Sequence, residues 1–211
     1  TVVYDYPETW SSSGLQGWTN SLGNATVSNP EAGGNDGGYM RVSFPELGVP
    51  PDPGEDSEIV RTSENPATSY FVGNYSDAGI ASARFDFLAE DVSAGYTQLR
   101  WRSSTNSHTW RYTFAVTGTN TWNTYNIPFS YSAGWIGDPG WNNEDQFLAD
   151  LLAVDWIGIF ISRGAPSTSE QDYGIDNFEL LVPEPGQISM LLAAGLALIL
   201  FTRDRRRSSS G

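Results

Sequence analysis

The side chains that most often carry out acid–base or nucleophilic chemistry are scarce in this 211-residue chain. His108 is the single histidine, there is no cysteine, and no Gly-x-Ser-x-Gly motif occurs. A Ser–His nucleophile pair could therefore use only His108 as its base, and His108 lies in a polar stretch typical of an exposed turn. Paired carboxylates for glycoside hydrolysis stay open, although most acids lie in expected loops. We therefore expect a non-catalytic protein.

Sugar recognition is a second chemistry that the residue types allow. It needs aromatic rings as platforms, with amides or acids at their edges. The stretch 130–143 is rich in Gly, Pro and Asn and supplies such a set, which is Trp135, Trp141, Asp138 and Asn142. The sequence thus predicts a carbohydrate site in this loop. The alternative is that the two tryptophans fold back as lids over the core.

The charge of the chain limits the partners that it can attract. The formal net charge is -14; residues 1–182 hold 23 of the 25 acids and seven of the eleven arginines, and there is no lysine. A surface of about -16 before the tail disfavours nucleic acid and anionic lipid. We therefore expect cations as counter-partners and no nucleic acid. Because cysteine is absent, the domain has neither disulfides nor a thiolate metal site.

These residues would be positioned by short strands. From Ala25 onward, runs of five to nine residues with period-two character are bounded by Gly, Pro, Asn, Asp or Ser, which is typical of an antiparallel β-sandwich. The expected strands are 39–44, 81–88, 97–103, 109–117, 121–129, 154–162 and 173–182. One short helix is expected after Asn142 or Asn143, with Phe147, Leu148 and Leu151 on its apolar face. The acidic, proline-rich stretch 45–58 is expected outside the core.

The segment from Tyr173 to Leu180 indicates the kind of sandwich. Ile175, Phe178 and Leu180 can anchor a final strand, while Asp176 and Asn177 interrupt it with oxygen ligands. With the preceding pattern, this segment resembles the galactose-binding-like jelly roll of carbohydrate-binding modules and laminin IV domains. The resemblance implies a structural Ca²⁺ near the chain ends, which would place Asp176 beside Asn35 and Asp36 in a Gly-rich turn.

The C-terminal tail combines three unlike elements in a fixed order. A Pro183-Glu184-Pro185 triplet opens a linker (183–187), an apolar helix follows (188–202), and a basic tail (203–211) ends the chain. The apolar positions include Ile188, Leu191, Leu192, Leu196, Ile199 and Phe201, and the basic cluster is Arg203, Arg205, Arg206 and Arg207. The apolar run rises about 21 Å at 1.5 Å per residue, which is short of a hydrocarbon core of about 30 Å. It is a marginal membrane span.

This tail resembles the PEP-CTERM sorting signal of exported bacterial proteins. The resemblance implies transient membrane anchoring and processing by an exosortase-type protease. The chain begins at Thr1 without methionine, so we expect that a leader has been removed or that a longer precursor exists. The expected organisation is an exported sandwich ectodomain (1–182) followed by its anchor, located in the cell envelope, at the cell surface or outside the cell.

Two functions from different classes fit these features. The first is a structural protein of the cell surface or extracellular matrix that assembles with copies of itself into oligomers or filaments through its hydrophobic helix. The second is a carbohydrate-binding module tethered to the envelope, with a polysaccharide as its partner.

Deleting residues 187–211 should give a soluble monomer with an intact sandwich, because apolar residues on every face of the tail helix need lipid or other tails to cover them. Sedimentation velocity and circular dichroism measure both properties. If the truncated protein still formed the oligomers of the full chain, the assembly role of the tail would be refuted.

Overall fold

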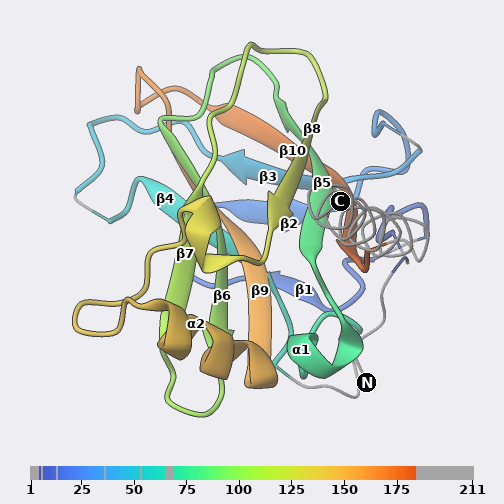
Figure 1. Cartoon of the computed structure of the whole chain (residues 1–211). Coiled ribbons are helices and arrows are strands. Elements are labelled where there is room, and N and C mark those ends of the chain that lie inside the picture. The colour runs from blue at the N-terminus through green and yellow to red at the C-terminus, as the bar shows by residue number, and fades with distance from the viewer. Residues whose placement is uncertain are drawn as a thin grey trace, which may run out of the picture.

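The computed structural model describes residues 5, 7–12, 14–35, 37–52, 54–64 and 69–183. They form a β-sandwich of two five-stranded antiparallel sheets (Figure 1). We name each sheet after its central strand. The β9 sheet contains, in spatial order, β1 (Trp18–Asn20), β4 (Ser57–Thr62), β9 (Val154–Ser162), β6 (Tyr96–Ser103) and β7 (Thr109–Thr113). The β10 sheet contains β2 (Thr26–Ser28), β3 (Met40–Phe44), β10 (Gln171–Leu181), β5 (Ser82–Ala89) and β8 (Asn123–Pro128).

Short helices close the ends of the sandwich. They are α1 (Tyr75–Ala78), η1 (Tyr131–Ala133), α2 (Glu144–Asp150) and η2 (Leu151–Ala153). The expected helix is confirmed as α2, since the Asn143 side chain accepts a hydrogen bond from Gln146 N at 3.0 Å and caps it. Phe147 of α2 contacts the inward-facing Trp101 and Trp110. Figure 1 shows α2 beside the lower ends of β6 and β7, so this helix covers one end of the core.

The core lies between the two sheets and is rich in aromatic rings. Side chains alternate between the core and the outer surface along each strand. Tyr173 and Ile175 of β10 therefore point inward, and both are fully buried. Phe178 then meets Trp18, Phe71 and Phe85 at ring-centroid distances of 4.9, 5.2 and 6.0 Å. Aromatic pairs at such distances add to the stabilisation that burial provides.

The expected sandwich of short strands is confirmed, with one clear correction. The stretch 45–58 was expected outside the core, but this is wrong at its end, because Ser57 and Glu58 begin β4 and Glu58 is 0% exposed. The Glu58 carboxylate accepts hydrogen bonds from five backbone N–H groups, those of Ser21, Leu22, Asn24, Ala25 and Ile59. A charged residue is thus buried because it organises the turn between β1 and β2.

The tail elements lie outside the described residues. These are the sorting triplet after Pro183, the helix 188–202 and the basic tail 203–211. Within the part of the chain that the structure describes, no helix has the length and apolarity to cross a membrane.

Replacing Glu58 with Gln should lower the free energy of unfolding by about 2–4 kcal/mol. The amide has only one acceptor oxygen, and its NH₂ group would face backbone N–H groups, which are also donors. Urea denaturation followed by circular dichroism measures the change. Glu55→Gln, at an exposed position in the same loop, should change stability by less than about 0.5 kcal/mol. Equal losses in the two variants would contradict this role of Glu58.

Candidate functional site

The outer face of the β10 sheet collects polar side chains from strands that are far apart in sequence. Along β10, Asp172, Gly174 and Asp176 point away from the core. They pair in register with Ser43, Arg41 and Asp86 of the neighbouring strands. Alternation therefore places acids, an arginine and a glycine in rows across the outer surface of one sheet, where Asp86, Gly174 and Asp176 are nonetheless buried.

An aromatic pair covers the middle of this face. Trp122 precedes β8 and crosses back over Gly174, and its ring meets Tyr39 edge-on at 5.6 Å. A Cβ atom at Gly174 would lie 2.6 Å from Trp122 Cη2 and 3.0 Å from Tyr39 Cδ2, so only glycine leaves room for the indole. Trp122 Nε1 donates to Gly33 O at 3.3 Å. The ring is thus fixed on the sheet surface while staying half-exposed.

A charged cluster lies next to the aromatic pair. Arg41 Nη2 contacts Asp172 Oδ2 at 2.7 Å and Glu90 Oε2 at 3.3 Å. The Tyr39 hydroxyl donates to Glu90 Oε1 at 3.2 Å. Burial and the charge of Glu90 raise the pKa of Tyr39, so its hydroxyl stays a donor at neutral pH. Arg41 Nε and Asp172 Oδ1 are buried without a hydrogen-bond partner, which leaves one donor and one acceptor unused.

Further along the face, two carboxylates hold a network of amides. Asp86 accepts hydrogen bonds from Asn35 Nδ2 at 2.7 Å, Asn177 Nδ2 at 2.8 Å and Thr124 Oγ1 at 2.5 Å. Asp176 is fully buried and accepts from the backbone N–H groups of Asn35 and Asn177, at 2.7 and 2.8 Å. These bonds connect the Gly-rich loop before Tyr39 to the middle of β10.

Two hollows lie at opposite ends of this face. One, of about 390 Å³, is lined by Thr26, Ser43 and Glu170 among others. The other, of about 260 Å³, is lined by Arg84, Asp86, Thr124, Asn177 and Glu179. Ser43 pairs with Asp172 and Arg84 pairs with Glu179, so the hollows are separated by most of the length of β10. The face between them suits an elongated ligand.

The structure buries one of the residues predicted to bind sugar and leaves Asp138, Trp141 and Asn142 partly or fully exposed, so sugar binding in this loop stays a prediction. Trp135 is 2% exposed, stacks on Phe129 and packs against Phe147, so the alternative of a lid over the core describes it. Trp141 is half-buried, donates to Asp150 Oδ2 at 2.8 Å, and has His108 against its ring.

The two polar members of that predicted set hold the loop in shape. Asn142 Oδ1 accepts from Gly137 N, and Asp138 Oδ2 accepts from Thr109 N. The sequence did not predict Trp122 as a site residue, because Trp122 lies in the expected strand 121–129. The signal that could have found it is Gly174 in the middle of another strand, which often marks close approach of another group.

The predicted calcium ligands are partly brought together. Asn35 and Asp176, separated by 141 positions, are hydrogen-bonded, whereas Asp36 lies outside the described residues. A Cβ at Gly34 would lie 2.8 Å from Asp176 Oδ2, so the loop approaches this carboxylate as closely as glycine allows. Within the described residues, no three His, Cys, Asp or Glu side chains converge as a metal site.

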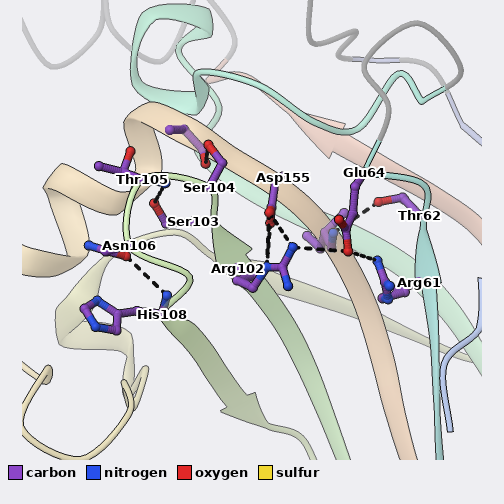
Figure 2. Close-up of polar contacts among 12 residues, drawn as sticks. Arg61, Thr62, Glu64, Arg102, Ser103, Ser104, Thr105, Asn106, His108 and Asp155 are labelled. Atoms are coloured by element: carbon purple, nitrogen blue, oxygen red, sulfur yellow. Dashed lines mark hydrogen bonds and ion pairs between the residues drawn. The ribbon is translucent and has the colours of Figure 1, made fainter.

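His108 lies in the turn between β6 and β7 (Figure 2). Its backbone N–H donates to Asn106 Oδ1 at 3.2 Å, and its ring Nδ1 is buried without a hydrogen-bond partner among the described residues. Its ring lies against Trp141, with centroids 4.1 Å apart. These contacts fix the turn.

Neither a protein-family model nor a curated protein matches this sequence. Solved structures do match. The family 11 carbohydrate-binding module of the cellulase Lic26A-Cel5E of Clostridium thermocellum has a TM-score of 0.54 at 19% identity, covering 87% of this chain and 96% of that one. A family 11 module from the same organism, in complex with a β-1,3-1,4-mixed-linked tetrasaccharide, has a TM-score of 0.53 at 20% identity, covering 80% and 91%.

An exo-β-agarase has a TM-score of 0.57 at 9% identity, and the match covers 85% of this chain but 26% of the enzyme. At these identities the matches show the fold, which is the jelly-roll sandwich of carbohydrate-binding modules. The fold that the sequence resembled is thereby confirmed.

Proposed function

We propose that the protein is a non-catalytic carbohydrate-binding domain that holds a polysaccharide chain on the outer face of its β10 sheet. The observation that carries this proposal is the half-exposed indole of Trp122, fixed over Gly174 on the outer surface of the β10 sheet between charged groups. The matches to carbohydrate-binding modules support it, because they have the same sandwich.

The chemistry of the face suits a sugar chain. The exposed part of the Trp122 ring offers an apolar surface to the C–H groups of a sugar ring. Arg41, whose side chain is 35% exposed, can donate hydrogen bonds to hydroxyl groups at the edge of that ring. The hollows beside Ser43 and beside Arg84 can take the neighbouring sugar units. A chain of several units therefore fits better than a single sugar.

Of the two functions inferred from the sequence, the carbohydrate-binding one is better supported. Self-assembly into filaments depends on the helix 188–202, which lies outside the described residues, so it stays a prediction. The proposed function fits the exported or surface location expected from the sequence, where the domain would meet extracellular polysaccharides. The sorting protease and the membrane stay expected partners of the tail.

We also propose that Asp176, Asn35 and Asp36 hold a structural Ca²⁺. Carboxylate and amide oxygens beside a Gly-rich loop are the donors that this hard cation prefers. The close approach of Gly34 to Asp176 supports the site. When bound, the ion would tie the loop before Tyr39 to β10 and so steady the aromatic pair.

Replacing Trp122 with Ala should weaken polysaccharide binding about tenfold or more, which corresponds to about 1.4 kcal/mol, because the stacking surface is lost. Affinity electrophoresis through gels that contain a panel of soluble polysaccharides finds the ligand, and calorimetry then gives Kd. Gly174→Ala should also weaken binding, since its Cβ displaces the indole.

Tyr70→Ala is the matched control, because Tyr70 is an exposed aromatic residue in the segment between β4 and α1; it should bind as the wild type does. Full binding by a correctly folded Trp122→Ala variant, or no binding to any polysaccharide in the panel, would refute the proposed function.

Removing Ca²⁺ with a chelator should lower the melting temperature of the full chain. A ligand that binds only the native state stabilises it by about 2.7 kcal/mol at 100 times its Kd. Differential scanning calorimetry with and without added Ca²⁺ measures the shift, and Asp176→Asn should abolish it. An identical melting temperature in both conditions would contradict the calcium site.

A further inference from the structure

The outer face of the β9 sheet concentrates arginines on an acidic protein. Four of the seven arginines in residues 1–182 lie on it, which are Arg61 in β4, Arg100 and Arg102 in β6, and Arg111 in β7. Arg61, Gly158, Arg100 and Arg111 form one row across the sheet, because each pairs in register with the next. This face is on the opposite side of the sandwich from Trp122.

Three of these four arginines lie over the aromatic rings that an exposed sheet face would otherwise present to water. Arg100 Cζ lies 3.7 Å from the ring centroid of Phe160. Arg61 and Arg102 lie 5.4 and 5.9 Å from that of Trp156. The outward-facing side of β9, which carries Trp156 and Phe160, is thus covered by guanidinium groups. Stacking holds each guanidinium in place while its N–H groups stay available at the ring edge.

The four arginines divide into two pairs by their counter-charges. Arg61 and Arg102 share Glu64, at 2.9 and 3.1 Å, and Arg102 also contacts Asp155 at 2.6 Å (Figure 2). Arg100 and Arg111 have no carboxylate within ion-pair distance among the described residues. Arg100 Nε donates to Gln98 Oε1 at 2.7 Å, and Arg111 Nη2 donates to Gly137 O at 3.3 Å.

Arg100 and Arg111 lie directly opposite each other on paired strands. Like charges in such a cross-strand pair repel each other. Burial, and then the charge of Arg111, lower the pKa of Arg100 to about 10, so it stays charged at neutral pH in an unfavourable setting. Asp138 is the nearby acid that opposes this effect, but its Oδ2 already accepts from Thr109 N. An anion placed between the two guanidinium groups would relieve the repulsion.

We propose that Arg100 and Arg111 bind a carboxylate of an acidic sugar, so that the protein recognises a glycan that carries isolated uronic acid units. The inference rests on the proposed function for the glycan nature of the ligand. Guanidinium groups on residues that lie directly opposite each other on paired strands can each donate to one oxygen of a planar carboxylate. The net charge of -14 repels a densely charged polyanion, so the fitting ligand has few acidic units.

The neighbours of Arg100 along β6 favour a sugar over an acidic protein segment. Tyr96, Gln98 and Arg100 alternate outward on the same strand, and Tyr96 is 45% exposed. An aromatic ring and a guanidinium are groups that contact sugar rings and carboxylates. The amide of the buried Gln98 links them, because it donates to the Tyr96 hydroxyl at 2.6 Å and accepts from Arg100 Nε at 2.7 Å. Protein interfaces need a buried apolar centre, whereas the Phe160 and Trp156 rings on this face are covered by arginines.

Calorimetry on the full chain tests the inference with two matched ligands. One is an oligosaccharide with a single glucuronate branch, and the other is the same oligosaccharide with that carboxyl group reduced to an alcohol. The wild type should bind the acidic form about tenfold more tightly, as one charge-assisted contact provides. Arg100→Gln and Arg111→Gln should each remove this preference in a protein that circular dichroism shows to be folded, because each leaves one guanidinium group for the carboxylate.

Arg61→Gln is the matched control, with the same charge change on the same face at an arginine that Glu64 already neutralises; it should keep the preference. The inference would be overturned by any of three results. The wild type could bind both oligosaccharides with equal affinity, Arg61→Gln could lose the preference for the acidic form to the same extent, or an aspartate-rich peptide could bind the same arginines more tightly. Binding of the acidic form alone, through Arg100, would support it while contradicting the neutral site around Trp122.

Discussion

A single irregularity in β10 determines both the core and the candidate binding face. Asp172, Gly174 and Asp176 point outward, so strict alternation would send Phe178 outward as well. Between Asp176 and Glu179 the register with β5 shifts by one residue, and Asn177 takes a positive φ of 51°. Asn tolerates this conformation well. The bulge turns Phe178 into the core against Trp18 and leaves Glu179 outside, paired with Arg84. Its conformation therefore holds the aromatic core and the polar network together.

Charged side chains on both outer faces of the sandwich contact specific partners. Among 25 acids, the few that lie in the sheets are tied to specific donors: Glu58 to five backbone N–H groups, Asp86 to two amides and a hydroxyl, and Asp172 to Arg41. On the β9 sheet the arginines dominate and cover aromatic rings. One sandwich thus presents two chemically different surfaces, one with an exposed indole among acids and one with guanidinium groups. Such a division suits a ligand whose neutral units bind one face and whose acidic units bind the other.

Much of the fold could be predicted from the sequence, because alternation and turn residues are local signals. The irregular spacing of Ile175, Phe178 and Leu180 already indicated an interrupted last strand, and Asn143 already indicated a helix cap. The candidate site could not be predicted in the same way. Trp122 and Trp135 both lie near turns. Only long-range packing places the Trp122 ring over Gly174 and buries the Trp135 ring in the core. The burial of Glu58 was also hidden, because its partners are backbone groups with no sequence signal.

The proposed function places a polysaccharide on the outer face of the β10 sheet. Backbone amide shifts in a ¹⁵N-labelled sample, followed by NMR while a soluble oligosaccharide from the panel is added, locate the ligand directly. A neutral polysaccharide bound there should shift amide signals in β3, in β10 and around Trp122 and leave the loop 130–143 unchanged. Shifts confined to Trp141 and the loop 130–143, with β10 unaffected, would contradict it.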